Sequence, residues 1–309
     1  MNSDFLLTHD LHACELCPIM CKTNRYEKPG AICRAGSKLR IARAALHFWE
    51  EPPLSGKAGS GTIFFSHCTM KCAYCQNYEI SHDGFGVDIS EHRLYEIFYE
   101  LKEQGALNIN LVTPSHFADA IARVIKRAKA DGFDLPIVYN TSAYERQEAI
   151  VALRDLVDIW LADYRYADNV LAQKYSRTRD YPEYALKAIE QMKQNLEDRG
   201  GRLLNVEGIM QRGLIVRHLI LPNQVEHSLE ALQRLYDTFG ADLELSIMNQ
   251  FTPVHSRYQN HDELKRSVSA EEYERVLDFA DDLGFEQYYW QDGPAMSESF
   301  IPPFDKTGV

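Results

Sequence analysis

The residues best suited to chemistry are seven cysteines, which lie in two groups within the first 75 positions of the chain. The second group consists of Cys68, Cys72 and Cys75, separated by three and by two residues. Three thiolates can hold one iron–sulfur cube, but a saturated cube uses four cysteines, so one iron stays open. An open coordination position distinguishes a catalytic metal site from a closed structural one. This group therefore predicts a cluster that can bind a small chelating molecule.

Two other interpretations of Cys68, Cys72 and Cys75 are half of a zinc site and small buried apolar side chains. Zinc usually takes four ligands arranged in two CxxC-like pairs. Neither a fourth cysteine nor a histidine pair follows Cys75 in the next turn of the chain. The spacing therefore favours the cluster.

The first group supplies four thiolates within 20 residues, and Pro29-Gly30 provides a turn that could bring the last of them back to the others. Tetrahedral sulfur ligation suits zinc and a closed iron–sulfur cluster equally well. Zinc would hold together a short N-terminal segment, whereas a closed cluster would relay electrons or contact substrate. The ligands of this N-terminal site would be Cys14, Cys17, Cys21 and Cys33, and both zinc and an iron–sulfur cluster stay open as predictions for it.

The composition is that of an ordinary globular protein, with 45% hydrophobic and 25% charged residues in 309. The net charge of −12 works against binding to nucleic acid backbones. No apolar run is long enough to cross a bilayer, and the first ten residues lack the basic region of a signal peptide. We therefore expect a cytoplasmic protein whose clustered cysteines bind metal and do not form disulfides.

After the second cysteine group, apolar strand-like segments alternate with amphipathic helical segments, which predicts parallel strands joined by right-handed crossovers. A helix is also predicted over Ser37–Trp49, because Leu39, Ala42 and Leu46 recur at helical spacing, and a last packing strand at residues 288–290. The strand-like segments are 62–66, 108–113, 135–139, 157–163, 214–221 and 243–249, and the helical segments are 91–104, 116–130, 145–155, 181–199, 225–238 and 270–283.

The cysteine run with Tyr74 in its aromatic position resembles the CxxxCxΦC signature of radical S-adenosylmethionine (SAM) enzymes. The resemblance implies an α/β fold, a partial (β/α)6 TIM-type barrel over residues 56–290. A metal-binding segment with four cysteines and a helix would precede it at residues 1–55, and a tail would follow at residues 291–309. It also implies a [4Fe-4S] cluster, SAM and a flavodoxin- or ferredoxin-type electron donor. The reduced cluster would cleave SAM to a 5′-deoxyadenosyl radical that abstracts hydrogen from a substrate.

In parallel barrels the chemistry collects at the C-terminal ends of the strands. Polar residues follow the strand-like segments of this chain at those places, and an arginine there suits a carboxylate because its guanidinium forms two parallel hydrogen bonds. The resemblance implies that Asp163 helps to hold a monovalent cation near the SAM carboxylate and that Arg217 contacts this carboxylate. The residues that the resemblance assigns to cofactor binding are Tyr74, Asn77, Thr113, Asn140, Asp163, Arg217 and His255.

Within the superfamily the chain is most similar to the activating enzymes of glycyl radical enzymes, such as pyruvate formate-lyase activating enzyme. That similarity implies an oxidoreductase that abstracts hydrogen from a glycyl residue of a partner enzyme. The segment Gly61-Thr-Ile-Phe-Phe lacks the arginine that this group carries there. The alternatives are radical modification of a peptide or small molecule with an auxiliary N-terminal cluster, and a zinc-binding interaction protein without catalysis.

Overall fold

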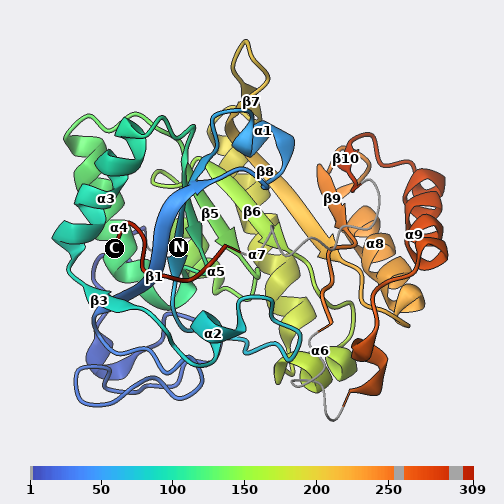
Figure 1. Ribbon diagram of the computed structural model, residues 1–309, viewed down its shortest axis with the longest axis horizontal. Coiled ribbons are helices and arrows are strands. Elements are labelled where there is room, and N and C mark those ends of the chain that lie inside the picture. The colour runs from blue at the N-terminus through green and yellow to red at the C-terminus, as the bar shows by residue number, and fades with distance from the viewer. Residues whose placement is uncertain (1–2, 254–260, 292–301) are drawn as a thin grey trace.

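A curved sheet of mainly parallel strands, with helices packed outside it, organises the computed structural model (Figure 1). The structure describes residues 3–253, 261–291 and 302–309. The strands follow the order β10-β9-β8-β6-β5-β4-β2-β1-β3, and β7 pairs with β8 alone. The alternation of strands and helices predicted from the sequence is confirmed, and it gives the parallel half-barrel described below.

Six parallel strands form the wall of the barrel. In all of them except β8, every residue is buried, because helices cover one face and the barrel interior the other. The register places Val112 opposite Asn140, and Arg217 opposite both Asp163 and Ser246. These polar side chains therefore share a level near the C-terminal strand ends. The strands are β2 (Ser60–Phe65), β4 (Ile109–Val112), β5 (Ile137–Thr141), β6 (Ile159–Asp163), β8 (Met210–Leu219) and β9 (Leu245–Met248).

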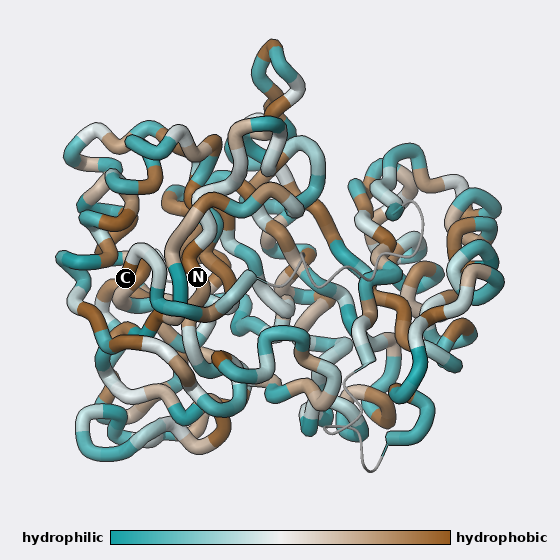
Figure 2. Tube along the Cα trace, in the orientation of Figure 1, coloured by the Kyte–Doolittle hydropathy of each residue, from teal (hydrophilic) through white to brown (hydrophobic). Residues whose placement is uncertain are grey.

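Several outer helices begin at side-chain caps and bury one face each. Ser90 caps α3, Asp168 caps α6, and Ser269 with Glu272 forms a complete capping box at α9. Hydrophobic and hydrophilic residues alternate along α9 in Figure 2, as expected for a helix that packs on one side only. The helices are α3 (Glu91–Glu103), α4 (Ala118–Ala130), α5 (Gln147–Ala152), α6 (Asn169–Ser176), α7 (Tyr181–Asp198), α8 (Val225–Phe239) and α9 (Ala270–Leu283).

The helix predicted over Ser37–Trp49 is wrong, because the structure has a strand there, β1 (Leu39–His47). It pairs antiparallel with β2 and with the short strand β3 (Val87–Ile89). An alanine-rich segment has helical propensity, but pairing with two strands and burial of Leu39 and Ile41 override that weak preference. The expected boundary after residue 55 therefore falls between two strands of one sheet.

Short elements complete the edges of the sheet. The predicted last strand is confirmed as β10 (Tyr288–Tyr289), which runs parallel to β9. The strand β7 (Leu203–Leu204) forms a hairpin with β8 that projects from the body at the top of Figure 1. The C-terminal residues 302–309 lie along β1, where the backbone N–H of Ala44 donates to Thr307 at 2.9 Å.

A plug closes the N-terminal end of the barrel. The short helix α1 (Pro52–Ser55) places Leu54 among the apolar side chains that fill the barrel interior near the N-terminal ends of the strands, including Val138, Leu161 and Ile215. Asn108, which directly precedes β4, fixes the plug by donating to the Leu54 carbonyl at 2.8 Å. The barrel is therefore packed at its base and can be hollow only towards the C-terminal strand ends.

The remaining short helices are η1 (Leu11–Ala13), α2 (Tyr78–Ser81), η2 (Ser115–Phe117) and η4 (Asp262–Lys265). The N-terminal segment around η1 packs on the barrel, since Leu6, Leu11 and Leu16 share one apolar cluster with Met70 and Tyr74 of the second cysteine loop. The two cysteine regions thus sit in one continuous core.

Candidate active site

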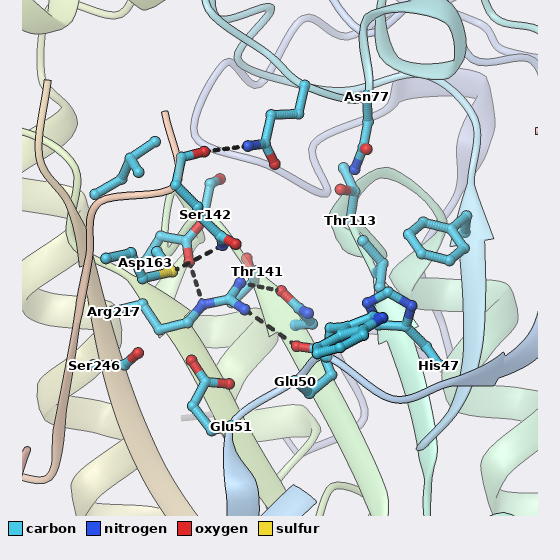
Figure 3. A pocket seen from close by; sticks show the side chains of 18 of the residues that line it. His47, Glu50, Glu51, Asn77, Thr113, Thr141, Ser142, Asp163, Arg217 and Ser246 are labelled. Atoms are coloured by element: carbon cyan, nitrogen blue, oxygen red, sulfur yellow. Dashed lines mark hydrogen bonds and ion pairs between the residues drawn. The ribbon is translucent and has the colours of Figure 1, made fainter. Parts of the chain in front are cut away.

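A cavity of about 730 Å³ lies within the barrel above the plug. Its wall includes all three cysteines of the Cys68–Cys75 loop, the polar strand-end residues, and the segment that joins β1 to α1. Figure 3 shows Asp163, Arg217 and Ser246 from the strand ends together with Glu50 and Glu51. Residues far apart in the sequence meet here because the C-terminal ends of parallel strands converge on one end of a barrel. The cavity is large enough for a nucleoside-sized molecule together with part of a second one.

Each cysteine of the loop lies within reach of a hydrogen-bond donor. The hydroxyl of Ser176 and the Nη1 of Arg165 lie 2.9 and 3.1 Å from the Cys72 sulfur. The hydroxyl of Ser81 lies 3.3 Å from the Cys75 sulfur, and the backbone N–H of Met70 lies 3.4 Å from that of Cys68. Such donors stabilise thiolates, the form that binds metal.

Without metal, burial favours the protonated form of Cys72 and Cys75. Burial raises the pKa of Cys75 to about 11, against the smaller lowering effect of the Ser81 hydroxyl. Burial likewise raises the pKa of Cys72, although Arg165 opposes the shift. Metal binding would replace these protons, and the positive charge of the metal would offset the unfavourable burial of the thiolates.

A chain of ion pairs runs from Cys72 into the barrel. Arg165 contacts the Oδ2 of Asp163 at 2.6 Å, and Arg217 donates from Nε to the Oδ1 of the same carboxylate at 2.8 Å. The Nη2 of Arg217 also donates to Asn140 at 2.6 Å. Burial alone would raise the pKa of Asp163, but the two guanidinium groups hold it below its ordinary value. The carboxylate is therefore ionised and both its oxygens are occupied.

The sequence-predicted residues Asn140, Asp163 and Arg217 are thus brought together, and Asn77 and Thr113 line the same cavity (Figure 3). Tyr74 also reaches it, but its hydroxyl accepts from Tyr166 at 2.7 Å and its ring packs in the core. His255 lies outside the described residues. The roles that the sequence predicts for these side chains stay predictions.

Backbone strain occurs at two residues of the cavity wall, His67 and Thr113, and at Lys71 of the cysteine loop. His67, Lys71 and Thr113 have φ angles of 75°, 56° and 61°, a region that residues other than glycine rarely adopt. For the β-branched Thr113 this conformation is an outlier, held by its N–H bond to the Asn140 carbonyl at 2.9 Å. Strained residues that persist in a fold cluster at functional sites, so these positions support the cavity as the site.

Sequence reasoning missed Glu50, Glu51 and Arg165. The two glutamates follow the segment that was expected to be helical, so their place beside Arg217 depends on the strand β1 and the plug α1. Arg165 could have been predicted from the sequence, because it lies two residues after Asp163, where β6 ends, and therefore near the same C-terminal end of the barrel.

The N-terminal cysteines do not line the cavity. Cys14, Cys17 and Cys33 are buried and Cys21 is half-buried, all unpaired with one another. Arg25, itself buried, approaches the Cys14 sulfur at 3.7 Å and donates to the carbonyls of His116 and Gly36, each at 2.6 Å. This arginine links the N-terminal segment to the barrel.

Comparison with known proteins agrees with this site. The family model described as a 4Fe-4S single cluster domain matches residues 54–179, which contain the Cys68–Cys75 loop. The uncharacterized protein MJ0674 of Methanocaldococcus jannaschii is 26% identical over an alignment of 288 residues, which covers 89% of this chain and 76% of that protein.

Among solved structures, the chain is similar to SuiB of Streptococcus suis, both in its complex with the precursor peptide SuiA and in its complex with S-adenosylmethionine. Each comparison has a TM-score of 0.50 and 13% sequence identity and covers 73% of this chain. The aligned part is less than half of SuiB, 46% and 48% of the two chains.

In the described ranges, no helix combines the length and apolar character needed to span a bilayer. The likeness to SuiB concerns the fold. The fold of this chain is therefore a partial TIM-type α/β barrel, similar to the aligned part of SuiB.

Proposed function

We propose that the protein is a radical SAM enzyme whose [4Fe-4S] cluster is held by Cys68, Cys72 and Cys75. The observation that carries the proposal is that all three sulfurs line one cavity together with the ion-paired residues of the strand ends. When bound, the cluster supplies the electron that cleaves SAM to methionine and a 5′-deoxyadenosyl radical, which abstracts hydrogen.

The number of cysteines supports a cluster over zinc. Cys68, Cys72 and Cys75 supply three thiolates, one fewer than a closed four-cysteine site takes, so one iron of a cube would stay open to a ligand.

The chain's own residues would position SAM. Three N–H groups of Arg217 are used by Asp163, Asn140 and Glu50, and its guanidinium has five, so two remain for a ligand carboxylate. Arg165 and Arg217 occupy both oxygens of Asp163. These guanidinium groups supply the positive charge that a monovalent cation would otherwise bring, so we propose that no such cation is needed.

The substrate that we propose is a protein or peptide. The similarity to activating enzymes favours a glycyl residue of a partner enzyme. The complex of SuiB with its precursor peptide favours peptide modification, with the N-terminal cysteines holding an auxiliary cluster. A flavodoxin- or ferredoxin-type protein would supply the electron in either case.

The test is anaerobic reconstitution with iron and sulfide, followed by SAM and dithionite. The wild-type protein should form 5′-deoxyadenosine, and Cys72→Ala should form none above the background without protein. Glu226→Gln, which changes an exposed residue of α8, serves as the control. Product from Cys72→Ala at the wild-type rate would refute the mechanism. Stoichiometric zinc without a brown chromophore or SAM binding would favour the zinc-binding interaction protein instead.

A further inference from the structure

Two adjacent carboxylates, Glu50 and Glu51, lie at the base of the cavity. They belong to the segment between β1 and the plug α1, and Figure 3 shows both beside Arg217. The side chain of Glu50 is 9% exposed and the residue Glu51 is 8% exposed. Burial of two neighbouring carboxylates is costly unless other groups compensate their charge.

The compensation inside the protein is incomplete. Glu50 accepts from the Nδ2 of Asn110 at 2.9 Å and from the Nη1 of Arg217 at 3.4 Å. The Oε2 of Glu51, in contrast, is buried and has no hydrogen-bond partner among the residues that the structure describes. Burial raises the pKa of Glu51, Ser246 in the same cavity wall lowers it by a smaller amount, and no donor of the described residues bonds Oε2. A buried acceptor of this kind is rare in folded proteins and calls for a ligand.

The charged residues of the cavity indicate which charge that ligand carries. The three carboxylates of Glu50, Glu51 and Asp163 face two guanidinium groups, those of Arg165 and Arg217. Arg165 also contacts the Cys72 sulfur, so part of its charge serves the cysteine loop. Burial raises the pKa of Glu50 and of Glu51, and Arg217 only partly opposes these shifts, so a further positive charge beside them would favour their ionised form.

Aromatic side chains frame the same cavity. Phe48, Trp49 and Trp290 line it and are 50%, 57% and 54% exposed, which is unusual for large apolar residues. Phe48 and Trp49 directly precede the two glutamates in the chain. Aromatic faces attract organic cations and also bind the aliphatic stem of such a group.

We propose that the cavity receives an aliphatic organic cation of the substrate, a primary ammonium or a guanidinium, whose charge is bound by Glu51 and Glu50 and whose stem passes the aromatic residues. The proposal rests on the proposed function, because it names the substrate class of that site. A lysine or arginine side chain of a peptide fits this description, and so does a free diamine.

SAM does not fill this role. The ion-paired residues Arg217, Asp163 and Arg165 separate Glu50 from the Cys72 sulfur, so the two carboxylates lie at the other end of the cavity from the cysteine loop. We therefore expect the cation and SAM to bind together.

The experiment is calorimetric titration of the reconstituted protein with acetyl-Gly-Lys-Gly-amide, the matching arginine peptide and cadaverine. Neutral controls are the same peptides with acetyl-lysine or citrulline. The cationic probes should bind at least about tenfold more tightly than their neutral controls, with Glu51→Gln reducing that affinity about 10- to 100-fold, as for loss of a charged hydrogen bond. Preference for a peptide over cadaverine would identify a peptide side chain as the source, and the reverse would identify a small amine.

Glu226→Gln removes the same charge from an exposed position of α8 and should bind like the wild type. Trp49→Leu should weaken binding without any change in charge, and circular dichroism melting confirms that each variant folds. Equal affinity for cationic and neutral probes would overturn the proposal, as would loss of peptide binding when SAM is added. Failure of the wild type to form 5′-deoxyadenosine would refute the proposed function alone, because calorimetry measures cation binding independently.

Discussion

The two cysteine regions contain the same residue type at similar spacing but stand in different surroundings. Cys68, Cys72 and Cys75 line a cavity and receive donors from Ser81, Arg165 and Ser176. The four N-terminal cysteines do not line that cavity, and Arg25 links their segment to the barrel. The difference teaches that two cysteine sets of similar spacing can differ in their access to a cavity, which only the Cys68–Cys75 loop has among the described residues.

The largest expected effect compares one ligand from each region. Cys72→Ala should abolish both the iron of the catalytic cluster and the formation of 5′-deoxyadenosine. Cys17→Ala should remove the N-terminal metal and leave the visible absorption of the other cluster. Anaerobic iron and zinc analysis of both variants measures this directly. If Cys17→Ala also lost all iron, the two regions would form one site and the comparison would fail.

Much of this comparison could be predicted from the sequence. The continuous apolar runs revealed the buried parallel strands, and the polar residues after them revealed the mouth of the barrel, because parallel strands end together. Asp163 and Arg217 are 54 residues apart in the chain, yet topology alone brought them to one level.

Other parts could not be predicted, because they depend on contacts between distant segments. The segment Leu39–His47 is rich in alanine, and only its pairing with β2 and β3 makes it a strand. Glu50 and Glu51 face the cavity because α1 plugs the barrel. No local pattern in the sequence carries that information.

A second prediction compares the two buried arginines, one beside each cysteine region. Arg165→Met should reduce the free energy of unfolding by about 3 kcal/mol, because it breaks a buried ion pair with Asp163. It should also abolish SAM cleavage. Arg25→Met should reduce stability by about 2 to 4 kcal/mol, because it leaves the carbonyls of Gly36 and His116 without their donor. Urea unfolding and the 5′-deoxyadenosine assay measure the two effects.

We expect Arg25→Met to retain SAM cleavage under conditions in which it is folded. Arg234→Met, which removes an exposed ion pair with Glu230, is the matched control and should change stability by less than about 1 kcal/mol. Equal loss of SAM cleavage in Arg25→Met and Arg165→Met would show that the N-terminal region takes part in the chemistry.

A third prediction concerns Glu145, a buried carboxyl that accepts from Thr141 at 2.5 Å and also from Ser115. Burial raises its pKa from 4.5 to about 7, and its Oε2 has no partner among the described residues. The folded protein therefore binds more protons than the unfolded chain between these pH values. Its contribution to stability is fully present below about pH 4.5 and is lost as the pH rises through 7, a change of about 3 kcal/mol.

Glu145→Gln should remove this pH dependence, since the amide keeps the shape of the carboxyl and does not titrate. The measurement is the urea midpoint of both proteins at about pH 5 and about pH 8, on either side of the raised pKa. The wild type should lose stability relative to Glu145→Gln at the higher pH. A constant difference between the two proteins would contradict the buried, protonated carboxyl and would indicate that Glu145 is ionised.

The smallest expected effect tests whether a single hydrogen bond to Cys72 contributes to the difference between the two cysteine regions. Ser176→Ala removes the hydroxyl that lies 2.9 Å from the Cys72 sulfur and leaves the ligand itself in place. A donor to the sulfur favours the reduced, more negative cluster, so its loss should lower the reduction potential. A neutral hydrogen bond worth about 1 kcal/mol corresponds to about 40 mV for one electron. Anaerobic redox titration monitored by electron paramagnetic resonance measures this shift, with Ser228→Ala, whose hydroxyl bonds His218 instead, as the control. An unchanged potential in Ser176→Ala would mean that the environment of Cys72 does not tune the cluster, and the contrast between the two cysteine regions would reduce to access alone.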